Sequence, residues 1–129
     1  FLGICIGLQM LNNFSEEGNI KGLEIIDGKV IKFKPKNHFN KVPHMGWNKV
    51  HRPKNHFMWN GISNNERFYF VHSYYVQPQN RDLVAGECVY EKPFCCAVSK
   101  ENIFAVQFHP EKSSQAGLQL LQNFTRWKV

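Results

Sequence analysis

Cys5 lies in the sequence GICIG (3–7), where an apolar strand gives way to a helix. A nucleophile at such a sharp turn adopts a strained backbone conformation that projects its side chain outward, and side chains on either flank would collide. Backbone N–H groups at the helix start would lower the pKa of the thiol and donate hydrogen bonds to an oxyanion. The segment predicts a cysteine nucleophile, and it equally suits an inert buried cysteine.

A base and a group that orients it occur together near the other end of the chain. His109 follows the apolar run 103–108, and Glu111 can return to the imidazole across the turn that Pro110 fixes. A thiolate nucleophile requires this kind of base and orienting group. His72, which follows the run 68–71, is a competing base without a carboxylate close to it in the sequence. We therefore expect catalysis by Cys5, His109 and Glu111, with His72 as the alternative base.

The elements that position these groups are mainly short strands. The pattern predicts a strand at 2–4 followed by a helix at 6–14. A hairpin is expected over 23–33, turning at Asp27-Gly28. Further strands are expected at 42–50, 67–76, 83–90, 94–99 and 103–108, with a helical turn at 57–62. The chain should close with an amphipathic helix that Ser113 or Ser114 caps.

Composition limits the alternatives to a single globular domain. The 129 residues include 43% hydrophobic residues and carry a formal net charge of +6, and no apolar run reaches the roughly 18 residues of a membrane helix. Four irregularly spaced cysteines, two of them adjacent, do not form a disulfide framework and favour a reducing cytoplasm. Zinc is disfavoured because no Cys-x-x-Cys pair accompanies the nearby histidines, which are His38, His44, His51 and His56.

The excess positive charge is concentrated in one stretch. Eight Lys or Arg and no Asp or Glu lie between Gly28 and Asn65. A nucleic-acid surface would use this charge with stacking residues, for which the candidates are Phe33, Phe39, Trp47 and Phe57. However, Lys32, Lys34 and Lys36 alternate with less polar residues, as a solvated strand face does. We expect a solvated or partner-facing surface and no nucleic acid.

Five segments together carry a family resemblance. They are GICIGLQ (3–9), SEEG (15–18), VPHMGWN (42–48), FYFVHSY (68–74) and QFHPEKS (107–113). They resemble the class I (triad) glutamine amidotransferases, and within that class the chain is most similar to the glutaminase subunits of imidazole glycerol phosphate synthase. The resemblance runs from Phe1 to about Phe124.

The resemblance implies a role for each matching residue. Cys5 would attack the glutamine amide, His109 would be the general acid and base, and Glu111 would orient His109. The Ile6 N–H would donate to the oxyanion. Glutamine would be held by Gly7, Gln9, Glu17, Ser73 and Tyr74. A partner would be contacted by His44, Trp47, Tyr69 and Lys112.

The resemblance also implies the architecture and the partner. We expect an α/β, flavodoxin-like mixed sheet flanked by helices and incomplete at its N-terminus, with residues 1–129 forming the C-terminal portion of one domain. The family's first strands and its oxyanion strand have no counterpart here, so the chain alone should be poorly stable or inactive. The partner would be a (β/α)8 cyclase that receives ammonia and makes imidazole glycerol phosphate and AICAR in histidine biosynthesis, and no cofactor is implied.

Two other functions remain open from the sequence. A paralogous glutaminase could feed a synthase that amidates a sugar in surface-polysaccharide assembly, because the glutaminase half does not touch the acceptor. A non-catalytic fragment could instead retain only the partner surface.

Overall fold

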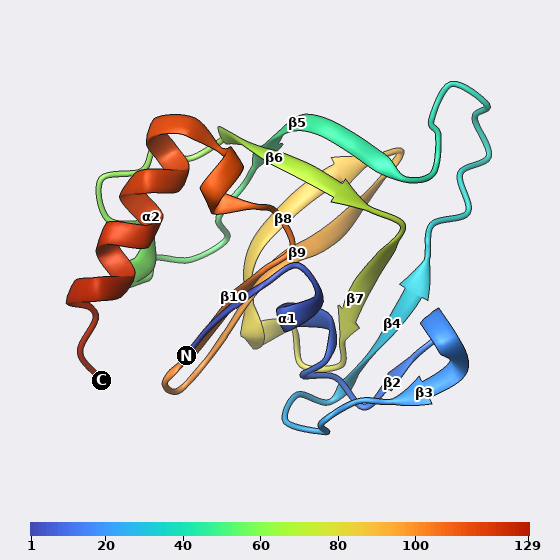
Figure 1. The fold of residues 1–129 in the computed structure, drawn as a ribbon, viewed down its shortest axis with the longest axis horizontal. Coiled ribbons are helices and arrows are strands. Elements are labelled where there is room, and N and C mark those ends of the chain that lie inside the picture. The colour runs from blue at the N-terminus through green and yellow to red at the C-terminus, as the bar shows by residue number, and fades with distance from the viewer.

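An eight-stranded mixed sheet dominates the computed structural model, which describes residues 1–129 (Figure 1). Its strand order is β1-β10-β9-β7-β4-β2-β3, with β8 paired to β9. Two neighbouring pairs, β1 with β10 and β2 with β4, are parallel, and the other pairs are antiparallel. The strands are β1 (Leu2–Ile4), β2 (Phe14–Ser15), β3 (Ile20–Lys21), β4 (Gly28–Lys32), β7 (Tyr74–Pro78), β8 (Val84–Tyr90), β9 (Lys92–Lys100) and β10 (Ile103–Val106).

A separate two-stranded sheet lies over the upper edge of the view in Figure 1. It pairs β5 (His44–Val50) with β6 (Glu66–His72), antiparallel. β5 starts two residues later than the expected position, directly after Pro43, which has no N–H to give to a strand ladder.

The prediction of one strand over 67–76 is wrong, because the strand is interrupted at Ser73. Residues before the break belong to β6 and the small sheet, whereas residues after it form β7 in the large sheet. The Ser73 carbonyl accepts a hydrogen bond from the Phe33 N–H (3.0 Å), which extends the register of β4 with β7 and leaves the ladder of β5 with β6. Ser73 and Tyr74 therefore lie where the two sheets meet.

The helix expected over 6–14 is also wrong in length. Its helical part, α1, covers only Ile6–Gln9. The Asn12 side-chain amide donates to the carbonyls of Leu8 (3.1 Å) and Gln9 (3.2 Å), which are the groups that a continuing helix would use. Asparagine side chains compete with helical bonding in this way, and the chain turns into β2.

The hairpin expected over 23–33 does not form. Only β4 is a strand, and it pairs with β2 and β7, whereas 23–27 is irregular. Gly28 is required here for close approach and not for a hairpin turn. A Cβ on it would lie 2.7 Å from Asn12 Oδ1 and 2.8 Å from the Gln77 carbonyl oxygen.

The C-terminal half agrees more closely with the elements predicted from the sequence. The expected strand pair is the β8–β9 hairpin, the expected helical turn contains the 3-10 helix η2 (Phe57–Trp59), and the closing helix is α2 (Ser114–Arg126). Leu120 of α2 is fully buried with Phe68, Phe70, Phe104 and Phe108 in one hydrophobic core. The mixed α/β sheet is confirmed, but its helices are limited to the single turn of α1 and to α2, which lies at the left of Figure 1. Neither helix has the length and apolar character needed to span a bilayer.

Candidate active site

Cys5 occupies the sharp turn between β1 and α1. Its backbone has φ 55° and ψ −108°, a strained conformation for a non-glycine residue, and its N–H donates to the Val106 carbonyl (2.8 Å). A Cβ on Gly3 would lie 2.7 Å from the Gly7 carbonyl oxygen, so the expected collision is confirmed on that flank. On the other flank the expectation is wrong, because a Cβ on Gly7 would meet no atom within 4 Å.

The Cys5 thiol is more basic than the sequence predicted. Burial is the largest influence and raises its pKa, and the Glu111 and Glu17 carboxylates raise it further. Hydrogen bonds from the Ile6 N–H and the Gln107 side chain act in the opposite direction, as donors to a thiolate should, but they do not prevail. The expected lowering is therefore wrong for this chain, because a single helical turn does not outweigh the cost of burying a thiolate.

His109 follows β10, the neighbour of β1. The two strands run parallel with Ile4 opposite Val106, so the turns that follow them emerge at the same end of the sheet. His109 Nδ1 donates to Glu111 Oε2 (2.9 Å), and the side chains are 18% and 49% exposed, respectively. This bond leaves Nε2 of His109 unused by the carboxylate. An imidazole held in this way can accept a proton while the carboxylate stabilises the imidazolium.

Ser113 fixes the backbone of His109. The Ser113 hydroxyl donates to the His109 carbonyl (2.6 Å) and accepts from the Tyr69 N–H (2.9 Å), and the His109 N–H donates to the Tyr69 carbonyl (2.9 Å). Ser113 was expected as a possible helix cap, but its side chain makes no capping bond. Its structural role is instead to join β6 to the turn that carries His109.

Gly117 allows α2 to approach that same turn. A Cβ on it would lie 1.9 Å from the Pro110 carbonyl oxygen in the 3-10 helix η4 (Pro110–Lys112). Sequence reasoning assigned no role to Gly117. The only sequence signal is a glycine inside an amphipathic helix, where it would otherwise be unfavourable.

His72 lies in the core and not at the rim. Its Nδ1 lies 2.8 Å from the Tyr74 carbonyl oxygen, and its Nε2 lies 2.9 Å from His44 Nδ1. Burial lowers the pKa of each imidazole to about 4. Because both nitrogens of His72 are occupied, it is a poor general base.

Two of the residues expected to hold glutamine, Gln9 and Glu17, are linked to Cys5. Gln9 is buried, and its amide nitrogen donates to the Tyr74 carbonyl (3.2 Å) and to Gln107 Oε1 (3.0 Å). Glu17, in the 3-10 helix η1 (Glu17–Asn19), is exposed, and its charge acts on the Cys5 thiol. Gly7 has open space above it, and Ser73 lies at the junction of the two sheets beside Tyr74.

Sequence reasoning assigned no role to Gln107, although this polar side chain is fully buried. Its amide nitrogen lies 3.7 Å from Cys5 Sγ. The available signal was a glutamine at the end of an otherwise apolar strand. Buried amides need hydrogen-bond partners, so such a position points to a polar network.

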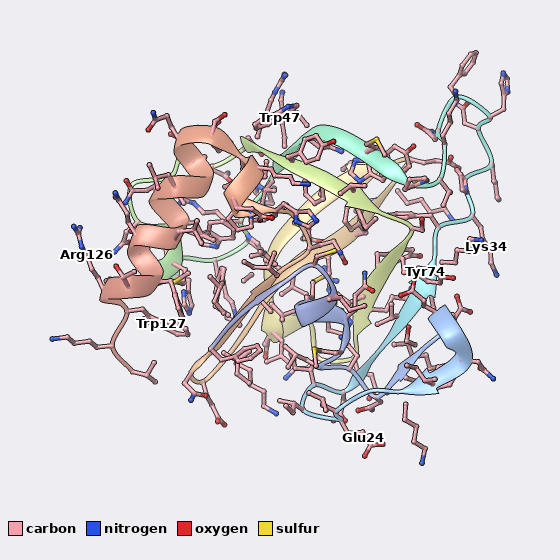
Figure 2. The ribbon with its side chains drawn as sticks, viewed as in Figure 1. Glu24, Lys34, Trp47, Tyr74, Arg126 and Trp127 are labelled. Atoms are coloured by element: carbon pink, nitrogen blue, oxygen red, sulfur yellow. The ribbon has the colours of Figure 1, made fainter.

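Three of the four residues expected to face a partner lie on the surface near the turn that carries His109. Trp47 projects from the outer side of β5 (Figure 2), and its ring packs edge-on against Tyr69 at 5.9 Å between centroids. Lys112 is exposed in η4, which Ser113 ties to Tyr69. His44 differs from these three because it is only 4% exposed and points inward.

The remaining cysteines differ sharply from Cys5. Cys88, Cys95 and Cys96 are free and buried, and burial raises the pKa of Cys88 and Cys95 to about 12. No group of three or more His, Cys, Asp or Glu side chains is arranged to hold a metal ion.

Comparison with protein families matches residues 1–127 to the family described as glutamine amidotransferase class-I. The chain is 59% identical to the imidazole glycerol phosphate synthase subunit HisH of Nitrosospira multiformis, covering 99% of this chain and 63% of that protein. It is 53% identical to the HisH subunit of Acinetobacter baylyi, with 99% and 63% covered. The chain thus spans a little under two thirds of the length of these relatives.

Solved structures show the same fold at low sequence identity. A glutamine amidotransferase from Thermotoga maritima superposes with a TM-score of 0.64 at 19% identity, covering 98% of this chain and 46% of that one. The glutaminase domain of Trypanosoma brucei CTPS, solved with bound acivicin, gives 0.65 at 18% identity, with 99% and 61% covered. The chain belongs to the class I glutamine amidotransferase family and is a homologue of the HisH subunits.

Proposed function

We propose that this chain carries the glutamine-hydrolysing centre of an imidazole glycerol phosphate synthase, with Cys5, His109 and Glu111 as its triad. The observation that carries the proposal is the pairing of two turns at one end of the sheet. One turn holds a strained cysteine at the start of α1, and the other holds an imidazole bonded to a carboxylate. The match to HisH subunits supports the choice of synthase.

The first half of the reaction releases ammonia. His109 takes the thiol proton, and Cys5 Sγ forms a bond to the side-chain carbonyl carbon of glutamine. The Ile6 N–H, which now interacts with the sulfur, would donate to the resulting oxyanion. The His109 imidazolium then protonates the leaving nitrogen, the C–N bond breaks, and a γ-glutamyl thioester remains. Because burial raises the pKa of the thiol, a base such as His109 is needed to take its proton for the attack.

The second half regenerates the thiol. His109 removes a proton from water as the water oxygen attacks the thioester carbonyl. The C–S bond breaks to give glutamate, and the His109 imidazolium returns the proton to Cys5 Sγ. Glu111 holds the imidazole in one tautomer and stabilises its charged form. Glu17 offers a carboxylate for the substrate ammonium group, and the segment from Ser73 to Tyr74 would line the same end of glutamine.

Ammonia would pass to a (β/α)8 cyclase subunit that makes imidazole glycerol phosphate and AICAR in histidine biosynthesis. Bulk water would protonate ammonia, so the two subunits must dock tightly around its path. The outer face of β5 and β6 supplies an apolar docking surface, with Met45 63% exposed and Trp47 48% exposed. Lys112, beside this face, would add a charged contact.

The same proposal assigns the chain to a larger domain and to a cellular location. Residues 1–129 would be the C-terminal portion of one flavodoxin-like domain, whose preceding strands complete the sheet beyond β1 and supply the second oxyanion donor. A cytoplasmic location agrees with four free cysteines and no disulfide.

Turnover by the native protein with its cyclase partner tests the proposal. We expect glutamate and ammonia in equal amounts and, in quenched samples, a glutamyl adduct on the peptide that contains Cys5. Cys5→Ala should abolish both signals, and Cys88→Ala should retain both. Partner binding without turnover would instead support the non-catalytic alternative.

A sugar-amidating synthase is separated from the cyclase by the acceptor. Ammonia incorporation into a phosphorylated ribulosyl-formimino nucleotide supports the histidine pathway. Incorporation into a nucleotide sugar would support the paralogous function.

A further inference from the structure

A continuous chain of buried and partly buried hydrogen bonds connects the nucleophile to the outer strand β5. From the outside inward it contains Asn48, His44, His72, the Tyr74 carbonyl, Gln9, Gln107 and Cys5. The proposed chemistry uses Cys5, and the family resemblance implies that Gln9 holds glutamine, but both buried histidines are left without a role. A fully satisfied buried network usually fixes one arrangement of its members, so the histidine pair needs an explanation.

The direction of each hydrogen bond between the Tyr74 carbonyl and Asn48, the outer half of the chain, follows from the bond at the Tyr74 carbonyl. The Tyr74 carbonyl can only accept, so His72 Nδ1 must carry the proton of their 2.8 Å bond. Because burial lowers the pKa of His72 to about 4, the ring is neutral near pH 7, and its Nε2 accepts from His44 Nδ1 at 2.9 Å. His44 Nε2 in turn accepts from the Asn48 amide at 3.3 Å, and that amide also donates to the Val89 carbonyl at 2.8 Å. Both imidazoles are therefore neutral and protonated on Nδ1.

Aromatic rings pack on both members of the pair and hold the planes of their rings. His44 stacks on Tyr90 at 4.2 Å and on Phe70 at 5.1 Å between ring centroids. His72 lies 5.0 Å from Phe33 in an edge arrangement. A flip of either ring would keep these ring contacts but would place carbon atoms where the hydrogen-bonding nitrogens now lie and leave buried nitrogens unpaired.

The inner half orients the amides beside the nucleophile. The Tyr74 carbonyl accepts from both His72 and Gln9, so both of its lone pairs are used. The Gln9 nitrogen faces two acceptors, the Tyr74 carbonyl and Gln107 Oε1, which fixes the direction of its amide. Gln107 then has only its nitrogen to offer to Cys5 Sγ. Loss of the His72 bond would free the Tyr74 carbonyl and, with it, the Gln9 amide.

We propose that His44 and His72 form a positioning pair, which fixes the Tyr74 carbonyl and Gln9 for glutamine binding and anchors them to Asn48 in β5. The pair does not touch glutamine and transfers no proton. It links the glutamine site to the strand that carries Trp47 at the surface (Figure 2). This inference rests on the proposed glutaminase function.

Two electrophiles separate glutamine binding from the reactivity of Cys5. An electrophile shaped like glutamine must occupy the binding site before it alkylates the thiol, so its rate saturates with concentration. Iodoacetamide needs only an accessible thiolate. Both rates are measured on the native protein in complex with its partner.

His44→Phe keeps a flat ring but removes both hydrogen bonds. We expect the half-saturating concentration of the glutamine-like electrophile to rise about tenfold, which is the effect of one lost buried hydrogen bond. The iodoacetamide rate should change by less than about twofold. His44→Asn places an N–H close to the original Nδ1 and should recover most of the loss.

Phe94→Leu is the matched control for packing. Phe94 lies 5.9 Å from the His44 ring and 5.4 Å from the His72 ring but makes no bond in the chain. If Phe94→Leu raises the half-saturating concentration as much as His44→Phe does, the pair acts only through packing and the proposal is overturned. An unchanged value in His44→Phe, or an equal loss of iodoacetamide reactivity, overturns it as well.

Nitrogen NMR of the native protein tests the pair without any substitution. We expect both rings to be neutral, with protons on Nδ1 and a coupling between His44 Nδ1 and His72 Nε2. A proton on Nε2 of His72 would overturn the inference. Failure of the proposed function has a different signature, since the native protein would then show no saturation with the glutamine-like electrophile.

Discussion

His109 and His72 both hydrogen-bond through Nδ1, but their surroundings make them chemically different. The partner of His109 is the Glu111 carboxylate at a partly exposed rim. The partner of His72 is a neutral carbonyl inside an aromatic core. A carboxylate stabilises an imidazolium, whereas burial opposes it. Under the proposed function, this difference in environment makes His109 the proton carrier and His72 a positioning group, although the residue type is the same.

The largest expected difference is in turnover. His109→Asn should lower kcat for glutamine hydrolysis by about 10³-fold, because general acid and base catalysis is lost. His72→Asn keeps a donor near the Tyr74 carbonyl and should lower kcat by less than about tenfold, with most of its effect on KM. Steady-state glutamate release by the native complex measures both variants. Equal losses of kcat would remove the distinction between the two histidines.

The acid stability of the core pair should be the next largest effect. The folded pKa values of His44 and His72 are lowered to about 4, below their usual value, so the unfolded chain binds more protons between about pH 6.5 and pH 4. Their stabilising contribution is complete above that range and declines as the pH falls through it. Tyr90 and His109 are the other titratable groups that face the pair.

Denaturant titration of the native protein across this pH range measures the decline. The His44→Phe variant is the comparison, because it has one fewer buried imidazole to protonate. Its free energy of unfolding should fall less steeply with decreasing pH. Parallel slopes would show that the pair is not the source of the acid sensitivity.

A smaller effect should follow from adding a side chain where α2 approaches the turn that carries His109. Gly117→Ala places a Cβ against the Pro110 carbonyl and should destabilise the fold by about 2 kcal/mol. It should also displace the turn that carries His109 and reduce kcat. Leu118→Ala, at an exposed position of the same helix, is the control for both thermal stability and turnover. A Gly117→Ala variant with unchanged stability and turnover would contradict the close approach of α2.

The smallest effect concerns the Ser113 clamp. Ser113→Ala removes the hydroxyl that joins Tyr69 to His109 and should lower kcat about tenfold with little change in KM. Ser113→Thr retains a hydroxyl and should recover part of the rate. A change confined to KM would mean that the clamp serves glutamine binding and not the orientation of His109.

The sequence predicted those parts of the candidate active site that depend on residues close together in the chain. Cys5 sits in its strained turn, and the bond from His109 to Glu111 spans two residues, so both follow from short motifs. The core pair could not be predicted in this way. His44 and His72 are 28 residues apart, and they meet only because β5 and β6 pair in one particular register.

The errors in predicting the fold also come from contacts between residues that are not neighbours in the expected local pattern. The run 67–76 is uniformly strand-forming, and only the competing ladders of two sheets break it at Ser73. The helix after Cys5 ends early because the Asn12 side chain takes over carbonyls of α1. Ser113 satisfies the local pattern of a helix cap, but tertiary contacts give its hydroxyl other partners.

Mapping which cysteine reacts with a glutamine-like electrophile tests the central claim most directly. The native complex is treated at low concentrations of the electrophile, and the peptides that contain Cys5, Cys88, Cys95 and Cys96 are quantified, with His109→Asn treated in parallel. The account predicts saturable modification of Cys5 alone, at least about 10²-fold slower in His109→Asn. Equal modification of all four cysteines, or a Cys5 rate that does not depend on His109, would contradict it.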